Sequence, residues 1–406
     1  MESMMQKEEF FHRTELAKRL SQTLMSADGS SGLFITGPRR TGKSTFIRED
    51  FIPAIGGPQG SHIVYVDLWA DQDANPGDAI VAVIRSELLK FDSFILRAAK
   101  GVGIDKIKVG GMEMSLNQVG FGQGETLTTA LTMLAIASKK SVVLIIDEAQ
   151  HTQVTEEGRK ALFALKAARD AMNATNGPGF RLFATGSNSD KLVSLVEDKD
   201  QAFYQAPLIV LPHLGDDYLV WLRERLPVDP RPSIDALKRA FTACNYRPEP
   251  LRAVLREIGL DFDLHPNEVD ARFEAMMAAS LTRTKSHFFQ QVNGLNPLES
   301  AVLKTMASQG KNFAPYTKDA FSSYKAFILA NTGEVAQDIN QSSVQMALER
   351  LRSNKFIWRA GRGAYLIEDS QHLDWLGEAL VQAQADVARA RTELQARASK
   401  VVPTNF

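Results

Sequence analysis

The 406-residue chain has little cysteine, almost no net charge and no long apolar segment. Its single cysteine, Cys244, excludes a disulfide framework within the chain and fits a reducing compartment, so we expect a cytoplasmic protein. No apolar run approaches the length of a membrane span, and the first eleven residues lack the basic-then-apolar pattern of a signal peptide. Because 47 basic side chains are balanced by 48 acidic ones, any nucleic-acid-binding surface has to be local.

The most informative segment is a glycine loop with the sequence GPRRTGKST, residues 37–45. It matches G-x-x-x-x-G-K-[ST], the phosphate-binding P-loop, and it has the strand before it and the helix after it that this motif requires. We expect Lys43 to reach the phosphates and the Ser44 hydroxyl to bind Mg²⁺, while backbone N–H groups surround the anion. The loop residues expected to bind nucleotide are Gly37, Pro38, Arg39, Arg40, Thr41, Gly42, Lys43, Ser44 and Thr45.

Apolar runs alternate with helix-length segments from about residue 33 to 211, which predicts a parallel α/β sheet. Most of the runs are continuous Val, Ile and Leu, as in strands buried on both faces. The predicted strands are Leu33–Thr36, Ile63–Leu68, Val142–Ile146, Arg181–Thr185 and Leu208–Leu211. The predicted helices between them are Lys43–Phe51, Gly77–Ala98, Thr126–Ala137 and Arg159–Met172.

One segment interrupts this alternation. Residues 105–116, DKIKVGGMEMSL, alternate polar and apolar side chains around two glycines, which predicts a β-hairpin. Two roles remain open for it: a structural insertion, or a contact with a partner or with DNA.

The strand at 142–146 is followed by two carboxylates. Asp147 can hold the Mg²⁺ shell, and Glu148 can polarise an attacking water. The next strand ends in Gly-Ser-Asn, where Ser187 and Asn188 are candidates to contact the γ-phosphate or to orient the water. Ordinary turn chemistry is the alternative for these two residues.

The P-loop, the segment VVLIIDEAQ and the segment FATGSNS, in this order, resemble the motifs of AAA+ ATPases. The branch they resemble contains origin-recognition and initiator ATPases, archaeal-type ATPases and STAND signalling NTPases. Residues 11–16, FHRTEL, resemble a box that packs near the adenine there, which implies roles for Phe11 and Arg13. The resemblance covers roughly residues 8–290 and implies ATP and Mg²⁺ as cofactors.

Two positions depart from the pattern of that family. Gln205 stands where relatives often carry an arginine that reaches a neighbour's ATP, so the source of any such arginine finger remains open. Lys199 is near but lacks the guanidinium fork. In the lid, residues 245–252, NYRPEPLR, stand where many relatives have a glycine followed by a sensor arginine. Either Arg247 or Arg252 is a candidate for that role, with a solvated surface arginine as the alternative.

Beyond residue 215 the pattern changes to helices. Helices predicted at 217–226, 233–243, 249–259 and 270–291 form a lid. Residues 297–367 then resemble a winged helix, with helices at Pro297–Ser308, Tyr316–Leu329 and Ser342–Arg352 and strands at Phe356–Arg359 and Ala364–Ile367. We therefore expect an AAA+ core at 1–214, a helical lid at 215–294, a winged-helix domain at 295–369, and a long terminal helix and tail at 370–406.

The predicted winged helix is basic within a neutral chain, with nine Lys and Arg against five Asp and Glu. Such cations contact phosphates, and Ser or Gln at the start of a recognition helix can reach base edges. The expected contacts with duplex DNA are Ser343, Gln345, Arg350, Arg352, Lys355, Arg359 and Arg362.

The leading interpretation is an AAA+ switch that binds ATP, hydrolyses it slowly through Lys43 and Glu148, and acts on DNA. The alternative is a STAND-like signalling or defence ATPase whose winged helix contacts protein and which controls a separate effector chain. A metabolic kinase would need an acceptor pocket, and the lid and winged helix argue against one. Self-association through the helix predicted at 375–399 also remains open.

Overall fold

The computed structural model describes residues 10–26, 32–58, 60–71, 74–91, 106–109, 112–115, 119–120, 126–153, 155–175, 177–186, 189–226, 230–261, 264–335, 339–361, 364–369, 371–381 and 392. The chain divides into two compact units, Met1–Glu274 and Ala275–Phe406, and the division falls inside helix α12 (Val269–Asn293). None of the helices in the described ranges has both the length and the apolar character needed to cross a membrane.

A five-stranded parallel sheet forms the centre of the first unit, in the order β2-β5-β6-β1-β7. The strands are β1 (Leu33–Thr36), β2 (His62–Asp67), β5 (Val142–Asp147), β6 (Phe180–Gly186) and β7 (Leu208–Val210). The predicted parallel α/β sheet is therefore confirmed, strand by strand. Because the strands are parallel, their C-terminal ends meet at one edge of the sheet, and the P-loop leaves β1 at that edge.

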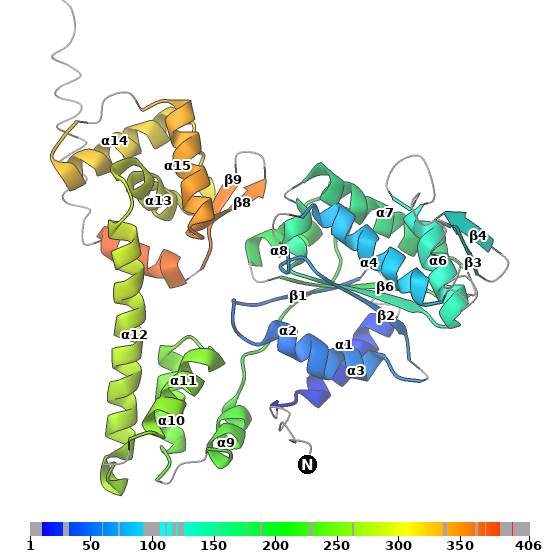
Figure 1. Ribbon diagram of the computed structural model, residues 1–406, viewed down its shortest axis with the longest axis horizontal. Coiled ribbons are helices and arrows are strands. Elements are labelled where there is room, and N and C mark those ends of the chain that lie inside the picture. The colour runs from blue at the N-terminus through cyan, green and yellow to red at the C-terminus, as the bar shows by residue number, and fades with distance from the viewer. Residues whose placement is uncertain are drawn as a thin grey trace, which may run out of the picture. The chain divides into compact units, whose positions relative to one another are not determined.

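Helices cover both faces of this sheet (Figure 1). One face carries α4 (Pro76–Lys90), α6 (Leu127–Ser138), α7 (Glu156–Asn173) and α8 (Ser189–Glu197), and the other carries α1 (Thr14–Met25), α2 (Lys43–Phe46) and α3 (Ile52–Ile55). Alternate residues of β5 serve the two cores: Leu144 and Ile146 face one, while Val143 and Ile145 face the other. The apolar sequence of this strand follows from burial on both sides.

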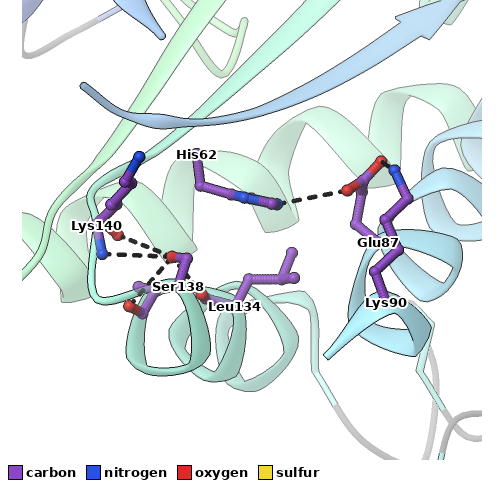
Figure 2. Close-up of polar contacts among 7 residues, drawn as sticks. His62, Glu87, Lys90, Leu134, Ser138 and Lys140 are labelled. Carbon is purple, nitrogen blue, oxygen red and sulfur yellow. Dashed lines mark hydrogen bonds and ion pairs between the residues drawn. The ribbon is translucent and has the colours of Figure 1, made fainter. Parts of the chain in front are cut away.

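A polar cluster closes the other end of the sheet, at the start of β2 (Figure 2). His62 Nε2 lies 3.4 Å from a carboxylate oxygen of Glu87 on α4, and Lys90 Nζ lies 2.6 Å from the second oxygen. At the end of α6, the Lys140 backbone N–H donates to Ser138 Oγ at 3.3 Å. Burial lowers the pKa of His62 against the opposing effect of Glu87, so the imidazole is largely neutral at pH 7. The contact between His62 and Glu87 ties β2 to α4 at the end remote from the P-loop.

The predicted hairpin is present as β3 (Lys106–Val109) paired antiparallel with β4 (Met112–Ser115). After β7, the regular elements in the described part of the first unit are helical, as predicted for the residues beyond 215. They are α9 (Asp216–Glu224), α10 (Ile234–Ala243), α11 (Pro248–Ile258), the short turn η6 (Pro266–Glu268) and the first turns of α12. Ser233 caps α10 with its hydroxyl, and its backbone N–H donates to Asp270 of α12 at 2.7 Å, which fixes these helices together.

Among the described residues of the second unit, α13, α14 and α15 follow the end of α12 and precede an antiparallel hairpin. Its elements are α13 (Pro297–Gln309), η7 (Gly310–Asn312), α14 (Lys318–Thr332), α15 (Gln341–Ser353), β8 (Ile357–Gly361) and β9 (Ala364–Ile367). They share one apolar core with the end of α12 and with helical residues 371–381, through buried side chains such as Phe288, Leu348 and Trp375. The long terminal helix is confirmed as far as residue 381, and its continuation lies outside the described residues, except for residue 392.

Candidate nucleotide-binding site

The P-loop runs from the end of β1 into α2. Gly42 caps this helix with φ 87°, a left-handed conformation that glycine adopts without a steric cost. Arg40 adopts φ 62° in the same turn. Thr41 Oγ1 donates to the Pro38 carbonyl at 2.8 Å and closes the loop. The result is a tight backbone turn that leads into a helix N-terminus, which is the geometry that favours an anion.

Lys43 is buried against the loop that carries it, with 6% of its surface exposed. Its Nζ donates to the carbonyls of Gly37 at 2.8 Å and Pro38 at 2.7 Å. Burial lowers the pKa of Lys43, and the nearby charges of Glu148 and Asp147 oppose that shift. The loop therefore holds a cation within electrostatic reach of both predicted carboxylates.

Asp147 is fixed from two sides at the end of β5, where it is 1% exposed. Thr185 on β6 donates to one of its oxygens, and Tyr65 on β2 donates to the other at 2.9 Å. Burial and the charge of Asp147 raise the pKa of Tyr65, so this phenol remains a proton donor at neutral pH. Arg48 Nη2 contacts Tyr65 Oη at 3.2 Å and Asp67 at 3.2 Å. The network sets the direction of the Asp147 carboxylate.

Glu148 lies beside this network and is partly exposed. Its backbone adopts φ 58°, a left-handed conformation that is uncommon for a residue with a side chain. Gln150, on the short helix η5 (Ala149–Gln153), donates its side-chain amide to the Glu148 carboxylate. The two carboxylates thus have different surroundings: Asp147 is enclosed, whereas Glu148 is held at the edge of the site.

An aromatic pocket of about 140 Å³ adjoins the P-loop. The Phe11 ring meets the rings of Tyr218 and Trp221 edge-on, at centroid distances of 5.5 Å and 5.7 Å. Arg13 donates to the Pro212 carbonyl at 2.7 Å. The pocket is lined by Phe10, Phe11, Arg13, Thr41, Gly42, Thr45, Phe46, Asp50, Leu214, Tyr218, Trp221, Pro248 and Arg252. Phe11 and Arg13 are therefore brought to the P-loop from the segment before α1.

The structure separates the two candidate lid arginines. Arg252 on α11 lines the aromatic pocket. Arg247 is 8% exposed, and its Nε donates to the Cys244 carbonyl at 3.1 Å in the turn before α11. Arg40 of the P-loop lies 3.5 Å from Glu249, also on α11. Of the two candidates, Arg252 is the one placed beside the loop.

The residues predicted on α15 have different environments. Ser343 and Asn340 form a reciprocal capping box, in which each side chain accepts from the other residue's backbone N–H. Gln345 accepts a hydrogen bond from Tyr316 and donates to Glu349 at 2.8 Å. The side chains of Ser343 and Gln345 are therefore already engaged within the second unit.

The cations on α15 and directly after it also differ from one another. Arg350 Nη1 lies 3.3 Å from the buried carboxylate of Glu299 on α13. Arg352 and Lys355 are exposed, and within the described part of the chain they form no salt bridge. Arg350 thus holds α15 against α13, while Arg352 and Lys355 face solvent.

Several predicted residues have no described side chain. Ser187, Asn188 and Arg362 lie outside the described residues, and Arg359 lies on β8 with its side chain undescribed. Gln205, in the position considered for an arginine finger, is exposed and adopts φ 64°.

Sequence reasoning did not identify Tyr65, Thr185 or Gln150 as parts of this site. Tyr65 and Asp67 are alternate residues of β2, so their polar side chains in a mostly apolar run were a usable signal. Thr185 similarly places a hydroxyl one residue before the end of the mostly apolar strand β6. Both signals become interpretable only once the sheet order places β2 and β6 on either side of β5.

None of the family models matches the sequence, and neither does any of the curated proteins. Among solved structures, the chain is similar to the ORC1 protein of Aeropyrum pernix in complex with DNA, with 13% identity, a TM-score of 0.40, and coverage of 93% of this chain and 95% of that chain. It is also similar to the ADP form of Aeropyrum pernix ORC2, with 13% identity, a TM-score of 0.48, and coverage of 94% and 97%. For CDC6P from Pyrobaculum aerophilum the identity is 16%, the TM-score 0.37, and the coverage 97% of both chains.

These identities and TM-scores are low, so the class of fold is taken from the chain itself. The P-loop follows β1. In the sheet order, β6 lies between β1 and β5, and β5 ends at Asp147 with Glu148 directly after it. Helices α9, α10 and α11 follow the last strand, β7. Together these features form a parallel α/β P-loop fold, as the sequence motifs predicted.

Proposed function

We propose that this protein is an AAA+ switch that binds ATP with Mg²⁺, hydrolyses it slowly and acts on duplex DNA. One observation carries the nucleotide part: buried Lys43, enclosed Asp147 and edge-placed Glu148 meet where the P-loop enters a helix. A fixed cation beside a helix N-terminus suits phosphate, and the two carboxylates suit a hydrated divalent cation and an attacking water.

The donor set at the P-loop fits Mg²⁺. This ion takes oxygen ligands and keeps several waters, so one or two side chains and the substrate phosphates suffice. Ser44 supplies a hydroxyl, and Asp147 supplies a carboxylate that Thr185 and Tyr65 hold in place. When bound, the ion would neutralise charge on the phosphates.

Removal of Mg²⁺ with EDTA should therefore stop phosphate release from ATP, whereas added Mg²⁺ should restore it.

The aromatic pocket beside the P-loop supports a bound purine. Phe11, Tyr218 and Trp221 offer flat apolar surface, and Arg252 adds a cation at its edge. We propose that this pocket takes the adenine and that Arg252 senses the phosphates from the lid. Turnover should be slow, because Gln205 is uncharged. Relatives often carry an arginine at this position that reaches the ATP of a neighbouring subunit.

The proposal that the second unit binds DNA rests on its order of elements and its charge. Helices α13, α14 and α15 followed by the hairpin β8–β9 have the order expected of a winged helix. The excess of basic residues in this region includes Arg352 and Lys355, which are exposed at the end of α15. We propose that these two side chains contact DNA phosphates, while Arg350, Ser343 and Gln345 mainly stabilise the helix.

The double variant Arg352→Ala, Lys355→Ala is expected to lower affinity for a labelled duplex by on the order of tenfold, because two phosphate contacts are lost. The slope of log affinity against log salt should decrease in magnitude by about 2. Fluorescence anisotropy titrations at several salt concentrations measure both quantities.

The matched control for this prediction is Lys318→Ala, Lys325→Ala, which removes the same charge from exposed positions on α14. It should bind the duplex more tightly than the α15 variant does. If the wild-type protein binds duplex without salt dependence, or if the two double variants are equivalent, the DNA-binding proposal is wrong and a protein partner for the winged helix becomes the better explanation.

A further inference from the structure

Gln150 is fully buried next to the proposed catalytic base. Its amide Nε2 donates to a carboxylate oxygen of Glu148, two residues earlier in the chain. The motif that suggested Glu148 gives no role to this glutamine. A buried amide bonded to a carboxylate at the edge of a site restricts where that carboxylate can point.

The surroundings of the Gln150 amide oxygen favour one of the two orientations of this amide. Its Oε1 is buried and has no hydrogen-bond partner among the described residues. A Cβ atom added to Gly186, at the tip of β6, would lie 2.3 Å from this oxygen. The Gln150 amide therefore lies between Gly186 and Glu148, with its oxygen against the glycine and its nitrogen bonded to the carboxylate. The reversed orientation would bring its oxygen against a carboxylate, which is repulsive.

The backbone of Glu148 leaves the direction of its side chain to contacts outside the strand. With φ 58°, this residue leaves the regular path of β5, so strand geometry does not set the direction of its side chain. Asp147, one residue earlier, has two donors on neighbouring strands. For Glu148, Gln150 supplies the corresponding contact.

We infer that Gln150 is a positioning residue that aims the Glu148 carboxylate at the attacking water, and that Gly186 provides the space for it. This inference rests on the proposed ATPase function. In that reaction the water oxygen bonds to the γ-phosphorus, and its proton passes to Glu148. The bond from that phosphorus to the β-phosphate oxygen breaks, ADP and phosphate leave, and Glu148 returns the proton to solvent.

The test is the variant Gln150→Met, which keeps the length of the side chain but removes its donor. The value of kcat for ATP should fall by at least about tenfold, whereas KM and the affinity for a fluorescent ATP analogue should stay within about twofold of wild type. The thermal midpoint should change little, because the loss of the hydrogen bond to Glu148 is offset by the removal of a buried acceptor that has no partner among the described residues. A purely structural role predicts instead that stability, affinity and turnover fall together.

Two further variants sharpen this test. Gly186→Ala should lower kcat as well, because the new methyl group displaces the amide of Gln150. The matched control is Gln153→Met on the same short helix, since Gln153 bonds to Ser194 and not to Glu148; its kcat should equal that of wild type. In the Glu148→Gln background, Gln150→Met should cause no further loss, because both changes act on one group.

The outcomes separate this inference from the proposed function. If wild-type turnover depends on Glu148 but Gln150→Met matches wild type, or behaves like Gln153→Met, the role of Gln150 is overturned and the ATPase proposal stands. If the wild-type protein shows no turnover that depends on Glu148, the ATPase proposal fails and the role of Gln150 fails with it.

Discussion

Lys43→Ala is expected to abolish nucleotide binding. The Lys43 ammonium is the buried cation of the P-loop, and it donates to the Gly37 and Pro38 carbonyls across the turn. Its loss removes the positive charge that would meet the phosphates and leaves Asp147 and Glu148 uncompensated. We expect affinity for a fluorescent ATP analogue with Mg²⁺ to fall by on the order of 100-fold or more.

The control for this change is Lys160→Ala, which removes an exposed lysine paired with Glu156 on α7. This variant should bind nucleotide as the wild-type protein does. Circular dichroism of both variants shows whether the fold is retained. Wild-type affinity in a folded Lys43→Ala protein would mean that the nucleotide binds elsewhere.

Glu148→Gln is expected to keep nucleotide affinity and to lose turnover. A glutamine has the same length and can still accept from the Gln150 amide, so the geometry at this position is preserved. It cannot take a proton from water, and the loss of a general base typically reduces turnover by about 10²- to 10⁴-fold. Steady-state phosphate release and a parallel binding titration separate the two effects.

The comparison variant is Glu156→Gln, which neutralises an exposed carboxylate in the first turn of α7. Its turnover should be close to that of wild type. Hydrolysis at the native rate by Glu148→Gln would show that another group serves as the base. In that case the positioning role inferred for Gln150 would fail as well.

The sheet and the phosphate loop are predictable from sequence because their signals are local. A continuous apolar run such as Val142–Ile146 identifies a strand buried on two faces, and the spacing of glycine and lysine identifies the loop. Helix α1 carries a signal as well: its buried residues Ala17, Leu20 and Leu24 recur every three or four positions. No helix is predicted there, because residues 11–16 resemble a motif, and that resemblance does not use the periodicity of the residues that follow.

The support around Asp147 could not be predicted in the same way. Tyr65 is 82 residues from Asp147 in the sequence, and Thr185 is 38 residues away. They meet because the chain places β2 and β6 on the two sides of β5, an order that no local pattern encodes. The different environments of Arg352 and Arg350, two residues apart on α15, likewise depend on Glu299 from α13.

Helix α12 determines where proteases can separate the two units of the chain. It continues for 25 residues through the division between the two units, with Phe273 buried before that point and Phe288 buried after it. Proteases act on extended backbone, so cleavage within this helix requires local unfolding. Limited proteolysis of the native protein should therefore leave the connection at Glu274 intact, and fragments separated there would each carry an incomplete helix.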